Sequence, residues 1–145
     1  MAQTAAIYRK RGEAIDYTPV SDVAAGQVVQ IGSIPMVAHA AIAAGALGAL
    51  YCDGVFDFPK TSDAFTAGDA VYWNSSGTPV TGDASSGAAD GATGNLAGVC
   101  IADAAAGDSY VRTKLTAAKR TTTIAGSVTA DDITGSDASL SVLGA

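Results

Sequence analysis

The side chains that could act as nucleophiles, proton carriers or metal ligands are few in this sequence and far apart. There is one histidine, His39, in an alanine-rich segment, and the two cysteines, Cys52 and Cys100, stand in different halves of the chain. A zinc site needs several such ligands at short spacing, and a catalytic thiol needs a base beside it. We therefore predict neither, and we interpret His39 as a structural or surface residue.

Aspartates are the remaining candidates for chemistry. Asp53 and Asp57 share one face of a predicted strand, where solvent-facing positions explain them without a catalytic role. Asp131-Asp132 and Asp137 superficially resemble a calcium loop, but the required spacing and the terminal glutamate are missing. The Gly-x-Ser-x-Gly pattern and the phosphate-binding pattern that ends in Gly-Lys-Ser/Thr are also absent. We predict no catalytic residue, no metal site, no cofactor and no enzymatic activity.

Charge gives a second set of candidates, for binding. The net charge is −6, which argues against non-specific binding to a phosphate backbone. The eight basic residues nevertheless cluster. A solvated or salt-bridged face is the preferred interpretation over a nucleic-acid patch, and the N-terminal cluster could also dock onto an acidic neighbour. The candidate interaction residues are Tyr8, Arg9, Lys10, Arg11, Arg112 and Lys114.

The domain that must position these residues has few large apolar side chains with which to form a core. A chain of 145 residues suits one domain, which buries roughly 70% of the surface that its unfolded chain exposes. Much of the 48% hydrophobic fraction is alanine, which buries little area, and large core residues are few. We therefore expect the chain to associate with copies of itself or with another protein.

Neither export nor membrane insertion is predicted. Residues 1–8 lack an apolar core of sufficient length, and the basic run follows them instead of preceding them. The apolar stretch 34–50 is interrupted by Pro35 and Gly45, and it is shorter than the roughly 20 residues of a spanning helix. Cys52 and Cys100 are accordingly expected to remain thiols on buried strands.

Glycine turns that precede apolar runs indicate strands. Ala25-Gly26-Gln27, Ala67-Gly68-Asp69 and Ala106-Gly107-Asp108 each come before a β-branched or aromatic run. In such turns glycine permits a backbone that a Cβ would penalise. Residues 124–126 repeat the turn in the tail and favour one more strand there.

We predict an all-β fold, a small compact β-barrel or β-sandwich-like domain of short antiparallel strands. Residues 1–13 form an extended N-terminal arm, residues 14–117 the β-rich domain, and residues 118–145 a C-terminal extension that packs on a neighbouring subunit. Residues 40–46 have helix propensity that two glycines weaken. Residues 82–95 are predicted to be a mobile surface loop. Strands are expected at residues 14–18, 27–31, 34–38, 49–61, 70–74, 96–102 and 109–115.

Four stretches of the sequence, taken in order, carry a resemblance. They are 14-AIDYTPVSDVAAGQVVQIG-32, 53-DGVFDFPK-60, 67-AGDAVYWN-74 and 97-AGVCIADAAAGDSYVRTKL-115. The set resembles the capsid cement, or head decoration, proteins of tailed phages, over about residues 1–115. Many such proteins are labelled RecA/RadA-family phage recombinases, a label that this chain does not support because it has no phosphate loop. The tail after Ala117 extends past the usual end of the family.

The resemblance implies a structural virion protein on the outer surface of a phage head. Its partners would be the major capsid protein and further copies of itself, as a homotrimer or alternatively a dimer, without nucleic acid, membrane or cofactor. The arm or the tail would add a strand to a neighbouring sheet edge. Two alternatives remain: another virion component, such as a head fibre base or tail protein, or a DNA-binding recombination accessory.

Overall fold

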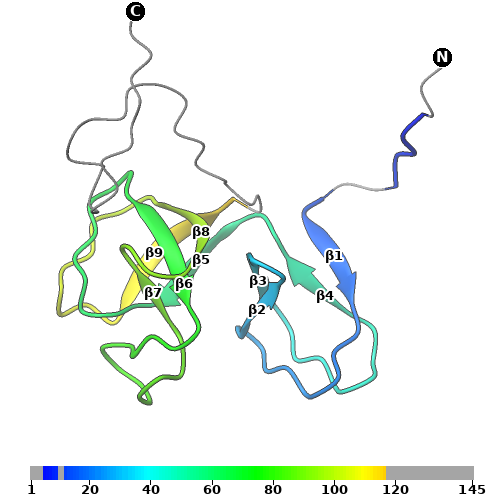
Figure 1. The fold of residues 1–145 in the computed structure, drawn as a ribbon, viewed down its shortest axis with the longest axis horizontal. Coiled ribbons are helices and arrows are strands. Elements are labelled where there is room, and N and C mark those ends of the chain that lie inside the picture. The colour runs from blue at the N-terminus through cyan, green and yellow to red at the C-terminus, as the bar shows by residue number, and fades with distance from the viewer. Residues whose placement is uncertain (1–4, 10–11, 117–145) are drawn as a thin grey trace, which may run out of the picture.

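The computed structural model describes residues 5–9 and 12–116, which contain nine strands and no helix. Two antiparallel sheets lie side by side (Figure 1). The first has the order β1-β4-β3-β2, formed by Ala14–Tyr17, Gly48–Tyr51, Ile34–Ala38 and Val28–Ile31. The second has the order β5-β9-β8-β6-β7, formed by Val55–Pro59, Tyr110–Leu115, Asn95–Cys100, Ala70–Asn74 and Ala88–Asp90. The prediction of an all-β fold is confirmed, and the predicted extension 118–145 lies outside the described residues.

The second sheet closes on itself to form a barrel. Lys60, directly after β5, makes a parallel bridge to Ala89 of β7, so the two outer strands of the sheet meet. The N–H of Thr61 donates to the carbonyl of Ala89 at 2.9 Å and continues this contact. Inside, the rings of Phe58 and Trp73 lie 5.9 Å apart between centroids. Closure removes exposed sheet edges, which would otherwise pair with other chains.

Each sheet has its own cluster of buried side chains. Leu50, Ile42 and Met36 belong to the cluster of the first sheet, and Phe58 and Trp73 to that of the second. Two residues of the first sheet join the second cluster: buried Val37 of β3, and partly buried Val28 of β2, which packs against it. The two sheets are therefore held together by apolar packing that includes side chains from β2 and β3.

The predicted strand 49–61 is wrong, because the chain changes sheets in its middle. β4 ends at Tyr51 and belongs to the first sheet, whereas β5 starts at Val55 and belongs to the second. Gly54 has a φ of +117°, a conformation that residues with a Cβ rarely adopt, and this turn interrupts the strand. The predicted alternation of faces still holds on both sides of the turn, with Phe58 buried and Asp57 exposed.

The predicted loop 82–95 is also partly wrong, because it contains β7. Ala88 and Ala89 are fully buried and pair with Asn74 and Trp73 of β6. Alanine has low strand propensity, so a sequence of small residues gives no strand signal here. Tertiary packing favours a strand here, because small side chains fit beside the large ring of Trp73.

The two sheets repeat one arrangement of strands. β1, β4, β3 and β2 lie in the same order as β5, β9, β8 and β6, and β7 is the addition. Each sheet carries two facing loops joined by a single bridge, between Val23 and Ile42 in the first and between Phe65 and Ala104 in the second. The weak sequence similarity between residues 37–51 and 99–115, which alone supports only a β-rich fold, thus corresponds to an internal structural repeat.

The glycines of the repeated turns are not equivalent. Gly68 has a φ of +102°, and a Cβ there would meet nothing within 4 Å. Gly107 has equally open surroundings, but its φ lies outside the positive range, so the expectation that its backbone requires glycine is wrong. We expect Gly68→Ala to lower the free energy of unfolding by about 1–2 kcal/mol through backbone strain alone.

The matched variant Gly107→Ala should leave stability unchanged or raise it by about 0.5 kcal/mol, since it restricts the unfolded chain. Urea unfolding of the two variants measures both values. Equal losses in the two variants would show that the turns share one backbone requirement, against this structure.

Candidate interaction surface

The outward side of β9 carries two of the predicted interaction residues. Burial alternates along β9: Val111, Thr113 and Leu115 are buried, whereas Arg112 and Lys114 face solvent. This is the pattern of an antiparallel strand with one face on the core and one in water, and it agrees with the predicted alternation.

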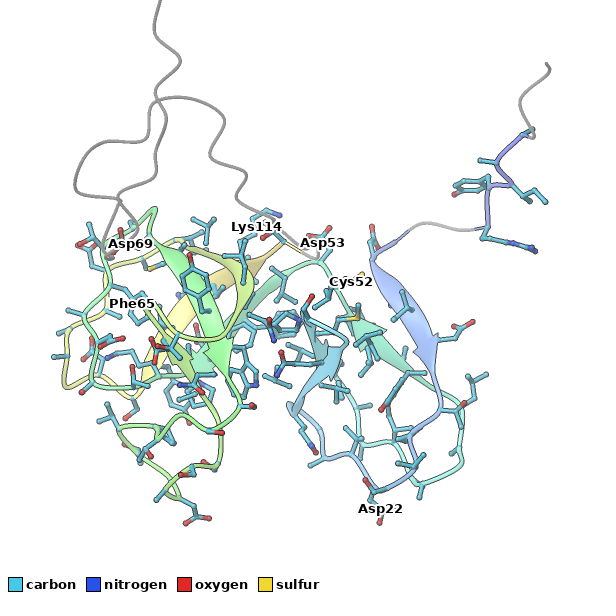
Figure 2. The ribbon with its side chains drawn as sticks, in the orientation of Figure 1. Asp22, Cys52, Asp53, Phe65, Asp69 and Lys114 are labelled. Carbon is cyan, nitrogen blue, oxygen red and sulfur yellow. The ribbon has the colours of Figure 1, made fainter. Side chains whose placement is uncertain are left out.

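Both cations are paired with carboxylates of the neighbouring chain segment. Arg112 donates from Nε to Oδ1 of Asp57 at 2.8 Å and from Nη2 to Oδ2 at 3.0 Å. Lys114 Nζ lies 3.3 Å from Oδ1 of Asp53, and Figure 2 shows the two side by side where the chain enters β5. Asp53 and Asp57 therefore balance these charges, which supports the salt-bridged interpretation over a nucleic-acid patch.

The pKa of both aspartates lies below its ordinary value. For Asp57 the hydrogen bond from Arg112 is the main cause, while partial burial acts in the opposite direction. For Asp53 the hydrogen bond from the N–H of Gly54 is the main cause, followed by Lys114. A carboxylate with a lowered pKa adds stability above its unfolded pKa, and this contribution disappears as the pH falls through the folded pKa. The stabilisation from both carboxylates is therefore complete at neutral pH and is lost only in acid, as the pH falls through the lowered pKa of each group.

Replacing Arg112 should change the pKa of Asp57 but leave that of Asp53 unchanged. In Arg112→Gln we expect the pKa of Asp57 to rise, because its main stabilising donor is lost. The pKa of Asp53 should stay low in the same protein, since its causes are Gly54 and Lys114. A carboxyl-carbon NMR titration measures both groups in one sample. A pKa of Asp57 that does not move would contradict the bidentate pair.

Exposed apolar side chains surround these ion pairs. Val55 and Val99 flank Lys114 in one cross-strand row, since both residues pair with it. Ile101, whose N–H donates to the carbonyl of Arg112, extends the next row. Tyr110 is 59% exposed and lies opposite Pro59. We call this surface the outer face, defined as Val55, Asp57, Val99, Ile101, Tyr110, Arg112 and Lys114.

Sequence reasoning identified only the two cations of the outer face. Val55, Val99 and Ile101 are apolar residues at positions whose parity points away from the core. The strand assignment alone shows which residues face outward, and apolar residues among them indicate a binding surface.

The N-terminal arm is separate from the outer face. Residues 5–9, including Tyr8 and Arg9, are all exposed and lie outside any strand. They project away from both sheets on the side of β1 (Figure 1). Lys10 and Arg11 lie outside the described residues. The structure thus does not bring Tyr8 and Arg9 together with Arg112 and Lys114.

The residues considered for chemistry are dispersed. His39 is exposed, and its ring lies 5.4 Å from that of Tyr51. Cys52 and Cys100 are both free and buried, as predicted, although Cys52 follows β4 instead of lying within a strand. Within residues 5–9 and 12–116 no three potential metal ligands cluster, and no helix there is long and apolar enough to cross a membrane. Asp131, Asp132 and Asp137 lie outside these ranges.

A groove separates the first sheet from the barrel. Its volume is about 480 Å³, and Val28 and Gln30 of β2 line one side. The other side is formed by Trp73 and by the segment between β6 and β7. None of its lining residues carries a charge; they are Gly26, Gln27, Val28, Gln30, Pro59, Trp73, Ser75, Pro79, Thr81, Gly82, Ser86 and Gly87.

Comparison with known proteins finds a family to which the described strands correspond. A family model described as phage cement protein matches residues 9–115, which includes all nine strands. No curated protein and no solved structure matches the chain.

Proposed function

Because the chain belongs to the phage cement protein family, we propose that it binds the outer surface of a tailed-phage head and stabilises contacts between capsomers of the major capsid protein. Its role in the capsid is structural. The observation that carries the proposal is the extent of the family match, which ends at the last residue of β9 and so covers both sheets described above.

The outer face is the part of this body that we assign to the capsid. Interfaces are enriched in tyrosine and arginine at their energetically important positions, and Tyr110 and Arg112 supply these two types. Exposed valine and isoleucine around the ion pairs add area that gains free energy when it leaves water. Internal pairing of Arg112 with Asp57 means that docking need not leave an unpaired charge buried.

Repetition would make such contacts effective. A cement protein acts in many copies on a repeating shell, so modest contacts to neighbouring capsomers add up through avidity. We infer a homotrimer, with a dimer as the alternative, and no enzymatic activity. The thin core agrees with a chain that completes its burial against partners.

Tyr110 gives the sharpest test of the outer face. We expect Tyr110→Ala to weaken attachment to heads by about tenfold or more, as for a central interface tyrosine. Leu47→Ala is the control, because Leu47 is 74% exposed and lies on the first sheet's side of the molecule. Quantitative co-sedimentation with heads measures both. If the two variants bind heads equally well, Tyr110 and the outer face around it do not form the contact with the capsid.

The function itself is tested by mixing purified protein with expanded heads, unexpanded procapsids and DNA. Saturable binding to expanded heads at many copies, without binding to DNA, is the expected result. Binding only to tail or portal components would favour another virion role. Salt-sensitive binding to DNA without head binding would favour the recombination accessory.

A further inference from the structure

The outer edge of β2 has backbone groups without a partner strand among the described residues. Ile31 and Ile34 face each other across the two-residue turn of the β2–β3 hairpin, so they form a hydrogen-bonded pair. Gln30 and Pro35 are the next pair and cannot be hydrogen-bonded, since proline has no N–H. The N–H and C=O groups of Gln30, and two residues earlier those of Val28, therefore point away from β3.

The barrel shows how such an edge is covered. β6 occupies the place in its sheet that β2 occupies in the first sheet, and β7 pairs along the outer edge of β6. β7 lies in the chain between β6 and β8, whereas β2 and β3 are joined by the short turn Gly32-Ser33. Within residues 5–9 and 12–116, the first sheet thus has no strand of its own at the position that β7 fills in the second.

The open edge borders the uncharged groove described above. Val28 and Gln30, whose backbone groups point outward, both line it, and Trp73 and Gly87 lie on its other side. An occupant would therefore be an extended segment with small or apolar, uncharged side chains. A charged segment would lose its hydration there without gaining a partner.

The N-terminal arm matches this description. Ala5-Ala6-Ile7-Tyr8 is uncharged and exposed, with Ile7 73% and Tyr8 81% accessible. It begins with the same Ala-Ala pair as β7, Ala88-Ala89. The arm precedes β1, at the opposite edge of the sheet from β2, and projects away from both sheets (Figure 1). The arm therefore does not occupy the groove of its own chain in this structure.

We propose that Ala5–Tyr8 of a second copy binds along the outer edge of β2 as an added strand, within the groove. Strand addition of this kind uses backbone hydrogen bonds for affinity and side-chain pockets for selectivity. Every copy carries both the arm and the groove, so the contacts can close by reciprocal exchange in a dimer or head-to-tail in a trimeric ring. The inference concerns contacts between copies and goes beyond attachment to the capsid.

Photo-crosslinking locates the arm directly. Ile7 is replaced by benzoylphenylalanine in a full-length chain, which is mixed with isotopically labelled chain, both free in solution and on heads. We expect crosslinks from position 7 to β2 or to residues 75–87 of the other copy. Crosslinks within one copy, to another surface, or only to the major capsid protein would overturn the proposal. The last outcome would leave the proposed function intact.

A pair of neighbouring serines supplies the matched control. Ser75 lines the groove and Ser76 does not, and both are exposed. Ser75→Lys should weaken association between copies by about tenfold or more, because it places a charge in an uncharged groove. Ser76→Lys adds the same charge and should leave association unchanged. Sedimentation velocity measures both, and equal behaviour of the two variants, or a wild-type chain that is monomeric at every concentration, would contradict the proposal.

Discussion

Gly98→Ala is expected to cost at least about 3 kcal/mol of unfolding free energy, because the added Cβ would overlap the backbone. A Cβ at Gly98 would lie 1.9 Å from the carbonyl oxygen of Lys114 and 3.1 Å from the Cα of Leu115. Gly98 pairs with Leu115 of β9 on one side and with Val71 of β6 on the other, so β8 cannot move away freely. Backbone atoms, unlike the end of a flexible side chain, have no other rotamer to adopt.

Chemical denaturation of Gly98→Ala, followed by tryptophan fluorescence, measures this loss. Trp73 reports on the same barrel, where it is 8% exposed. Gly107→Ala serves as control, because its Cβ would meet nothing within 4 Å and its φ is not positive. If Gly98→Ala were as stable as this control, β8 and β9 could not approach each other as closely as described.

Lys60→Met is expected to destabilise the chain by about 3 kcal/mol, the scale found when a buried, hydrogen-bonded polar group loses its partner. The side chain is 0% exposed. Its Nζ donates to the carbonyls of Thr61 at 3.0 Å, Asp63 at 2.8 Å and Ala106 at 3.3 Å. Methionine has similar length and no donor, so these carbonyls would lose that hydrogen bond. These carbonyls belong to two different loops. Lys60 holds both loops at the place where its own backbone bridges to β7 and closes the barrel.

Lys114→Met is the matched control for Lys60→Met. Lys114 is exposed and makes a surface ion pair, so the same substitution there should change stability by no more than about 0.5–1 kcal/mol. Both proteins are compared in the same urea titration. Similar midpoints would show that Lys60 does not act as a buried tie between the loops.

Neither of these two residues is conspicuous in the sequence. Gly98 interrupts an apolar run without a turn signal, and only the approach of β9 shows why a side chain is excluded. Lys60 follows a proline at the end of a predicted strand, where lysine ordinarily faces water. Its burial depends on carbonyls from residues 61, 63 and 106, and the last of these lies far away in the chain. Local pattern predicts which residues form strands, but not which loops converge on one amino group.

The candidate site was predictable to the extent that it follows strand parity. The alternation in Tyr110–Leu115 placed Arg112 and Lys114 outward, and the aspartates of residues 53–57 were assigned to solvent, as found. Their mutual pairing was not predictable, since it requires the register of β5 on β9. This register cannot be inferred from one predicted strand over residues 49–61, because the turn at Gly54 places β4 and β5 in different sheets. Likewise, the open edge of β2 became visible only beside its repeat, β6.

Capsid binding is tested most directly by a cryo-electron microscopy reconstruction of expanded heads with and without the protein. We expect extra density at repeated positions on the outer shell, bridging neighbouring capsomers, with the outer face turned toward the major capsid protein. Density confined to the portal or tail, or shells that are identical with and without the protein, would contradict it.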